Sequence, residues 1–355
     1  MTSRREFLLG AGAIAAGTGM LSAHGAAEPD PKLRKEGKLT TKPGALPITG
    51  TFLDEISHDI PHQNWSEREW DTDFAHMKTI GIDTVIMIRC GHRKFITYPS
   101  RYLMERRGCF RPPVDLVDLF LRLADKHGMR FFFGLYDPGD RWDELGTMAP
   151  LAEINRFVVE EVWKAYGHYR SFGGWYISSE IGRKIGDCIP SVRAMGRACK
   201  DVSGNLPTFI SPWIDGRKAI SAWDSAVAKD KGISASQHER EWDEILDGIH
   251  DAVDICAFQD GFLDFSELDE FFAVNRRICD KHGMKCWMNA ETFDRDMPIK
   301  FLPIKFEKLL LKLAAAKRAG CDKAITFEFS HFMSPQSMYP SAGHLYNLYR
   351  ECFRI

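Results

Sequence analysis

The segment Phe172-Gly-Gly-Trp-Tyr-Ile-Ser-Ser-Glu-Ile-Gly182 has the pattern of a buried strand that carries a carboxylate at its end. Its apolar run, residues 175–177, is preceded by two glycines and followed by Ser178, Ser179 and Glu180. Such runs are typical of parallel strands that are covered on both faces. In a closed α/β barrel, catalytic groups lie at the carboxyl ends of the strands. Glu180 is therefore the first candidate catalytic residue.

The rest of the chain predicts such a barrel. From Leu46 onward, apolar runs of strand length alternate with amphipathic stretches of helix length, which is typical of βα units around a parallel sheet. We expect eight strands, at residues 48–53, 84–88, 129–135, 174–178, 207–211, 253–258, 284–288 and 323–327. An open doubly wound sheet would favour a Gly-rich phosphate loop after its first strand, and none follows Leu53. The prediction is a single-domain α/β fold, a (β/α)8 TIM barrel over residues 47–355, with an extra insertion within residues 217–251.

A five-residue repeat supports this count of units. Asp125-Lys-His-Gly-Met129 recurs as Asp280-Lys-His-Gly-Met284. Both copies are expected to be helix ends in which Gly takes the left-handed cap position and leads into a strand.

The N-terminal residues are expected to be a targeting signal. Ser3-Arg-Arg-Glu-Phe-Leu8 precedes an apolar, Gly/Ala-rich run at residues 9–21, which is the pattern of a twin-arginine signal peptide over residues 1–27. A membrane anchor would need a longer apolar run. Residues 28–46 are polar and predict a linker. We therefore expect a periplasmic or secreted protein, exported by the twin-arginine pathway, with no membrane span in its mature form.

Charge and cysteine content exclude several classes of protein. The net charge is −2 and no basic block is present, so no nucleic-acid partner is expected. The nine Cys are odd in number and show no CxxC or Cys/His ligand spacing, so most are expected to be small core residues, with at most one or two disulfides. No cofactor and no metal are predicted, the expected partner is a carbohydrate substrate, and we expect a monomer.

The residues that follow the predicted strands should share one face of the barrel. That face is rich in carboxylates, amides and aromatic rings, which is the composition of a carbohydrate site. The candidate substrate-binding residues are Asp54, Asn64, Trp65, Arg89, Tyr136, Asp137, Trp213, Gln259, Asn289 and Glu328, and further mouth residues are Glu55, His92, Trp142, Asp215, Asp260 and His331. Each also has an ordinary structural reading, as a helix cap, a turn residue, an ion-pair member or a packed ring.

Two carboxylates at opposite sides of the mouth would suit glycoside hydrolysis. That reaction needs one carboxyl group to protonate the leaving oxygen and another to attack the anomeric carbon or to activate water. Glu180 and Glu291 follow the fourth and seventh strands, and by analogy with barrel glycosidases Glu180 is the acid/base and Glu291 the nucleophile. Retention or inversion depends on their separation, about 5 Å or about 6.5 to 9.5 Å.

Several motifs resemble the DUF4434 family. They are Gly50-Thr-Phe-Leu53 with Asn64-Trp65 and Trp70, then Met77-Lys-Thr-Ile-Gly-Ile-Asp-Thr-Val-Ile86, Tyr98-Pro-Ser100, Asp115-Leu-Val-Asp-Leu-Phe-Leu-Arg-Leu-Ala-Asp125, Phe132-Phe-Gly-Leu-Tyr-Asp137 and Gly174-Trp-Tyr-Ile-Ser-Ser-Glu-Ile181. The resemblance runs from about residue 47 to the end of the chain, more loosely after Pro212. It implies a bacterial, exported barrel protein similar to glycoside hydrolases, and its Trp-Tyr-x-x-x-Glu motif carries over to Glu180. Ser179 stands where many barrel glycosidases have Asn, which weakens the analogy with their recognition of the sugar 2-hydroxyl.

Three functions remain open from the sequence. The favoured one is an exported glycoside hydrolase that cleaves an oligo- or polysaccharide with Glu180 and Glu291. A metal-dependent sugar isomerase or lyase could instead use Glu180, Asp215, Glu291 and Glu328 as ligands. A non-catalytic glycan-binding barrel is the third.

Overall fold

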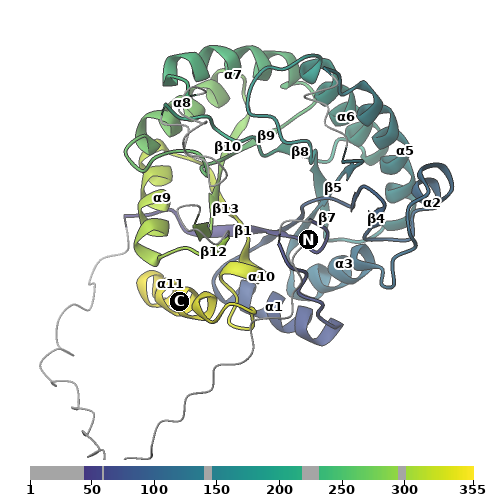
Figure 1. The fold of residues 1–355 in the computed structure, drawn as a ribbon, viewed down its shortest axis with the longest axis horizontal. Helices are drawn as coiled ribbons and strands as arrows, with labels where there is room; N and C mark the ends of the chain where they lie inside the picture. The colour runs from purple at the N-terminus through teal and green to yellow at the C-terminus, as the bar shows by residue number, and fades with distance from the viewer. Residues whose placement is uncertain (1–43, 58–59, 140–145, 218–231, 295–300) are drawn as a thin grey trace, which may run out of the picture. The chain divides into compact units, whose positions relative to one another are not determined.

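Eight parallel strands close into a barrel that is surrounded by helices (Figure 1). The computed structural model describes residues 44–57, 60–139, 146–217, 232–294 and 301–355. The strands follow one another around the barrel in the order β1-β13-β10-β9-β8-β7-β5-β2. Their bounds are β1 (Ile48–Leu53), β2 (Thr84–Met87), β5 (Arg130–Gly134), β7 (Phe172–Tyr176), β8 (Thr208–Ile210), β9 (Ile255–Gln259), β10 (Lys285–Glu291) and β13 (Lys323–Phe327). The predicted TIM barrel is confirmed, with each expected strand at its place.

The helices between these strands form the outer layer. They are α1 (Glu67–Thr79), α2 (Arg101–Arg107), α3 (Leu116–His127), α5 (Ala149–Tyr166), α6 (Cys188–Ser203), α7 (Ala235–Ile249), α8 (Leu268–Lys281), α9 (Phe306–Ala319), α10 (Phe329–Phe332) and α11 (Pro340–Phe353). A capping box of Ser66 and Glu69 opens α1, and Gly128 and Gly320 end α3 and α9 in the left-handed conformation. No described helix is long and apolar enough to cross a membrane.

Two small sheets lie in loops beyond the barrel strands. β3 (Gly91–His92), β4 (Phe95–Ile96) and β6 (Tyr136–Asp137) form one, and β11 (Phe293–Asp294) pairs with β12 (Leu302–Pro303). The predicted signal peptide, most of the predicted linker, Trp142 and residues 218–231 of the predicted insertion lie outside the described residues.

The five-residue repeat builds the same contact twice. His127 Nε2 and Lys126 Nζ, at the end of α3, lie 2.8 and 2.7 Å from the carboxylate of Asp71 on α1. His282 Nε2 and Lys281 Nζ, at the end of α8, lie 2.8 and 2.6 Å from the carboxylate of Asp243 on α7. The first copy therefore joins α3 to α1, and the second joins α8 to α7.

Large side chains fill the inside of the barrel. The inner cluster includes Phe52, Ile86, Phe132, Tyr176, Phe209, Ala257, Trp287 and Ile325. Successive strand residues point to opposite faces, so the inward position of Trp287 on β10 also turns Asn289 and Glu291 inward. All nine Cys are buried free thiols, as expected for small core residues.

Candidate active site

Glu291 is the last residue of β10 and is 3% exposed. Its carboxylate lies directly over Gly261, in the loop after β9. A Cβ atom at Gly261 would lie 2.2 Å from Oε1 and 2.3 Å from Oε2 of Glu291. Since no side-chain carbon fits between them, the absence of a side chain at Gly261 makes room for the carboxylate.

A buried ion pair holds the main chain of Glu291 from the side of the helices. Lys312 Nζ, on α9, donates to Asp260 Oδ1 at 3.0 Å and to the carbonyl oxygen of Glu291 at 3.1 Å. The N–H of Glu291 donates to Asp260 Oδ1 at 3.2 Å. Burial raises the pKa of Asp260 above its ordinary value, although the charge of Lys312 opposes that shift. The pair thus fixes both polar groups of the Glu291 peptide.

Arg89, which follows β2, lies among carboxylates. Its Nη1 donates to Asp137 Oδ2 at 2.7 Å, and His92 Nδ1 contacts the same oxygen at 3.1 Å. Burial opposes the guanidinium charge, but the carboxylates of Glu180, Asp137 and Asp54 outweigh it and raise the pKa of Arg89. Arg89 therefore contacts Asp137 directly and lies within electrostatic range of two further predicted site residues, Asp54 and Glu180.

Glu180 lies four residues after the end of β7, and the loop that contains it contacts α7. Trp242 Nε1, on α7, donates to the carbonyl oxygen of Gly182 at 3.1 Å. The indole of Trp213 covers Gly182 so closely that a Cβ atom there would lie 1.8 Å from Nε1. Trp213 is only half-buried, so part of its ring remains accessible near Glu180.

Amide and hydroxyl groups connect the fifth, sixth and seventh strands of the barrel. Asn289 Nδ2 donates to Ser211 Oγ at 3.1 Å, and Gln259 Nε2 donates to the carbonyl oxygen of Ser211 at 2.6 Å. Both Gln259 and Asn289 are nearly inaccessible, with exposed fractions of 9% and 2%. They line the base of the mouth.

Several buried polar atoms at this end of the barrel have no hydrogen-bond partner among the described residues. They are Asp54 Oδ2, Arg89 Nε, Tyr176 Oη and Asn289 Oδ1. Buried polar groups in native proteins are nearly always paired with protein, water or ligand. All four belong to the carboxyl-terminal parts of barrel strands or to the loops that follow them, where Glu180 and Glu291 also lie.

Four other predicted residues lie in packed or peripheral positions. Tyr136 is 2% exposed, and its hydroxyl donates to the carbonyl oxygen of Arg93. Trp65 packs edge-on against Trp70, with ring centroids 5.0 Å apart. Asn64 is exposed and has a φ of 55°. These placements leave Tyr136, Trp65 and Asn64 out of the group around Glu180.

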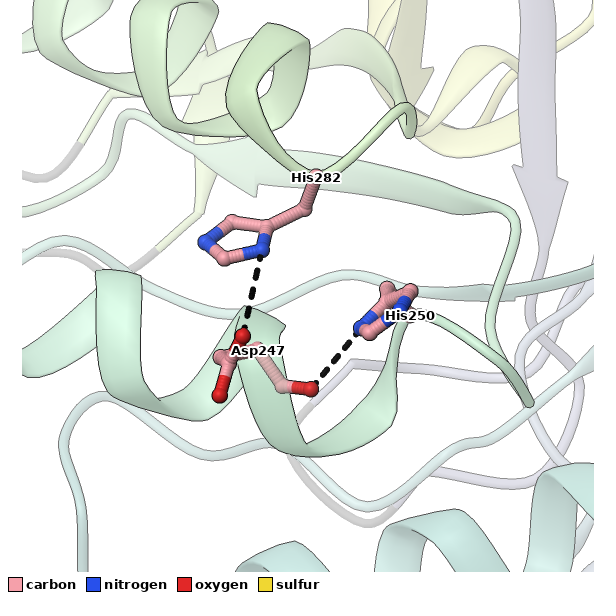
Figure 2. A group of neighbouring side chains, drawn as sticks. All are labelled: Asp247, His250 and His282. Atoms are coloured by element: carbon pink, nitrogen blue, oxygen red, sulfur yellow. Dashed lines mark hydrogen bonds and ion pairs between the residues drawn. The ribbon is translucent and has the colours of Figure 1, made fainter.

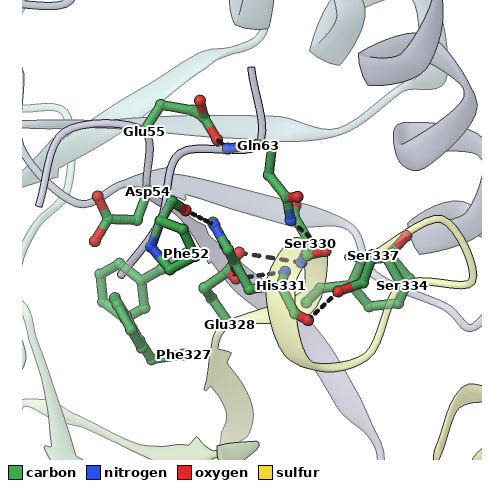
Figure 3. A network of polar contacts seen from close by, with 12 residues as sticks. Phe52, Asp54, Glu55, Gln63, Phe327, Glu328, Ser330, His331, Ser334 and Ser337 are labelled. Carbon is green, nitrogen blue, oxygen red and sulfur yellow. Dashed lines mark hydrogen bonds and ion pairs between the residues drawn. The ribbon is translucent and has the colours of Figure 1, made fainter. Parts of the chain in front are cut away.

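Glu328 is the fourth of the predicted residues that lie outside the group around Glu180. It forms a buried pair with His331 (Figure 3). Its carboxylate accepts from the N–H groups of Ser330 at 3.0 Å and His331 at 2.6 Å, and contacts His331 Nδ1 at 2.5 Å. Burial would lower the pKa of His331, but Glu328 raises it to about 9. Glu328 therefore caps α10 and binds an imidazolium, with no exposed surface.

Glu55 belongs to the same loop region. It accepts from the N–H of Gln63 at 2.9 Å, and Gln63 in turn donates to the carbonyl oxygen of Ser330 (Figure 3). Burial raises the pKa of Glu55 to about 7. This network ties the loop after β1 to the end of β13.

The site list drawn from the sequence omits Lys312, Tyr176 and Ser211, and Asp260 appears there only as a mouth residue. Lys312 had a readable signal, because it lies between Leu309 and Leu313 on the apolar stripe of its helix. A lysine in such a stripe is almost never buried unless it is paired.

Comparisons with known proteins identify the family. The chain matches the model of the family described as “Domain of unknown function (DUF4434)” over residues 48–339. It is similar to the crystal structure of a “putative alpha-L-fucosidase” from Bacteroides thetaiotaomicron VPI-5482, with 63% identity and a TM-score of 0.85 over 90% of this chain and 98% of that one. A comparison with curated proteins finds no match.

More distant structures share the fold alone. The endo-1,4-beta-D-mannanase of Thermotoga petrophila RKU-1 has 11% identity and a TM-score of 0.54 over 86% of this chain and 99% of that one. The beta-galactosidase of Marinomonas ef1 has 11% identity and a TM-score of 0.51 over 81% of this chain and 54% of that one. The chain therefore belongs to the DUF4434 family and has the barrel fold of glycoside hydrolases.

Proposed function

We propose that the protein is a glycoside hydrolase in which Glu180 and Glu291 are the two working carboxyl groups. The observation that carries the proposal is the support of Glu291, whose carboxylate lies over Gly261 while its N–H and carbonyl are held by Asp260 and Lys312. A buried ion pair adds little net stability. The pair of Lys312 and Asp260 is therefore better explained by a need to hold Glu291 in position. Glu180, at the end of the fourth strand, lies near the opposite charge of Arg89.

The proposed reaction breaks the bond between the anomeric carbon and the leaving oxygen. Glu180 gives a proton to that oxygen, and Glu291 attacks the anomeric carbon or activates the water that does so. Water supplies the new hydroxyl on the anomeric carbon. Arg89, Asp54, Gln259 and Asn289 would bind sugar hydroxyls, and Trp213 would stack on a sugar face.

An α-L-fucoside is the first substrate to test. The reason is the similarity to the Bacteroides thetaiotaomicron protein described as a “putative alpha-L-fucosidase”, which is 63% identical over 98% of its length. A panel of aryl glycosides and fucosylated oligosaccharides would include the α-L-fucoside beside β-galactoside, β-mannoside and β-xyloside. Export to the periplasm or beyond is also part of the proposal, and it rests on the twin-arginine pattern alone.

Substitution of each carboxyl group tests the assignment. Glu180→Gln and Glu291→Gln should each lower kcat about 10²- to 10⁴-fold, because the amide neither exchanges a proton nor attacks the anomeric carbon. Glu307→Gln, at an exposed position on α9, removes a carboxylate without touching the mouth and should leave kcat unchanged. Circular dichroism and thermal unfolding would establish that all three variants fold.

Two results would contradict the proposal. Full activity in a folded Glu180→Gln or Glu291→Gln variant would remove that residue from the reaction. Binding of glycans by the wild-type protein without cleavage of any panel member would instead favour the non-catalytic barrel.

A further inference from the structure

A second cluster of ligand-type side chains lies outside the proposed active site. Asp247 and His250 come from the end of α7, and His282 follows α8 (Figure 2). A carboxylate oxygen of Asp247 and one ring nitrogen of each histidine all lie within 4.8 Å of one another. Helix ends lead into the amino ends of the strands in a βα barrel, so this cluster lies at the end of the barrel opposite to Glu291.

The ring of His282 is oriented by a carboxylate outside the cluster. Its Nε2 lies 2.8 Å from Asp243 Oδ1, and its Nδ1 faces Asp247 Oδ1 at 3.8 Å. When Nε2–H donates to Asp243, the neutral ring keeps a lone pair on Nδ1, which faces Asp247. A carboxylate on the far nitrogen is the usual support of a histidine that binds a metal.

The charge around the cluster also favours a cation. His250 and His282 are the C-cap residues of α7 and α8, and helix C-termini carry partial negative charge. Lys281, the residue before His282, is bound by both oxygens of Asp243 at 2.8 and 2.6 Å. Its positive charge is thereby largely offset.

The repeated helix contact provides an internal comparison. Asp71 on α1 is held by Lys126 and His127, just as Asp243 is held by Lys281 and His282. Four and seven residues after Asp71 come Ala75 and Lys78, whereas Asp247 and His250 occupy the corresponding positions after Asp243. The helix contact forms without the extra carboxylate and imidazole, so packing alone does not account for them.

We propose that Asp247, His250 and His282 bind a divalent transition-metal ion, with Zn²⁺ as the probe. Two imidazoles and one carboxylate form a donor set that suits Zn²⁺, and water completes the coordination. The ion would join α7 to α8 at the end of the barrel opposite to Glu291. The proposal is independent of the glycoside hydrolase assignment, because its readout is binding.

Calorimetric titration of the chelator-treated full chain with ZnCl₂ tests the site. We expect one equivalent of bound Zn²⁺ and a rise in Tm, because the ion binds the folded chain. His250→Ala and Asp247→Asn should each weaken binding at least about tenfold, since each removes one of three protein ligands. The control His127→Ala lies in the matched helix contact and should bind Zn²⁺ as the wild type does.

A transplant sharpens the test. Ala75→Asp combined with Lys78→His gives the first helix contact the two donors that it lacks, at exposed positions, and should add a second equivalent of Zn²⁺. Absence of stoichiometric binding by the wild type, or binding that survives His250→Ala unchanged, would overturn the proposal. Loss of Zn²⁺ binding in His127→Ala would do so too.

Discussion

Gly261 and Glu291 show how one residue without a side chain defines the position of another residue's carboxylate. Gly261 does not have a positive φ, so an alanine there would be free of backbone strain. The nearest obstacle is the Glu291 carboxylate, whose Oε1 lies 2.2 Å from the position of the added Cβ. A substitution at this position therefore separates the placement of Glu291 from its chemistry.

Gly261→Ala should lower kcat by about tenfold or more, because a displacement of about 1 Å can cost about a hundredfold in rate. Gly44→Ala is the matched control, since no atom lies within 4 Å of its added Cβ. Steady-state kinetics on the best substrate of the panel would measure the effect. Equal kcat values for the two alanine variants would show that the carboxylate position is unimportant for the reaction.

The site residues that the sequence places well are those still within strand geometry. Asn289 and Glu291 lie two and four residues after Trp287 on β10. Since side chains of a strand alternate between its two faces, they point inward as Trp287 does. Tyr136 and Glu328 lie beyond the paired residues of β5 and β13, where alternation no longer sets side-chain direction. A count of strand ends finds the mouth of the barrel but not the direction of the side chains that follow it.

At the scale of elements, the buried lysine Lys312 connects α9 to the proposed active site. Lys312 Nζ contacts both Asp260 and the carbonyl oxygen of Glu291, and its side chain is 8% exposed. Removal of one partner of a buried ion pair leaves the other charge without compensation. Loss of the lysine alone would therefore cost stability, and it would also release the main chain of Glu291.

Lys312→Met should destabilise the protein by about 3 to 5 kcal/mol, because it leaves the carboxylate of Asp260 buried and alone. Lys317→Met, on an exposed position of the same helix, should change stability by less than about 0.5 kcal/mol. Urea unfolding of both variants measures the difference, and kcat of the folded Lys312→Met protein reports the placement of Glu291. Equal free energies of unfolding in the two variants would mean that the ion pair is dispensable.

Strands and helices were predictable because each has a local pattern, whereas contacts between helices were not. The eight strands appear where the apolar runs lie, with ends that differ by at most three residues. His282 meets Asp247 only because α8 packs on α7, and no spacing within one helix encodes that meeting. The contact of Lys281 and His282 with Asp243 could be seen in the sequence only as a repeated motif. The motif does not indicate that Asp243 is its partner.

At the scale of the whole molecule, the two ends of the barrel chain are tied together. β1 pairs with β13, and the hydroxyl of Tyr349 on α11 accepts from the N–H of Ile48 at 2.8 Å. Asp73 on α1 accepts from Ser330 Oγ at 2.8 Å and also binds Ser334 Oγ. Closure therefore depends on polar contacts between segments about 260 to 300 residues apart.

Asp73 makes this closure sensitive to pH. The residue is fully buried, and burial raises its pKa from the ordinary 3.8 to about 7. A carboxyl group whose pKa is raised in the folded state contributes stability that is complete below about pH 4 and is lost as the pH rises through about 7. By the pKa difference, this loss is at most about 4 kcal/mol.

Asp73→Asn should therefore flatten the decline in the free energy of unfolding between about pH 4 and pH 7, since an amide keeps its hydroxyl contacts and has no proton to lose. Asp71→Asn, two residues earlier on α1, is a control of opposite sign, because Lys126 and His127 lower the pKa of Asp71. Its loss of stability should appear above about pH 4, where the exposed ion pair forms. Denaturant unfolding at several pH values measures both curves. If the wild type and Asp73→Asn lose stability in parallel from pH 4 to pH 7, Asp73 is ionised throughout and the closure of the barrel does not depend on its proton.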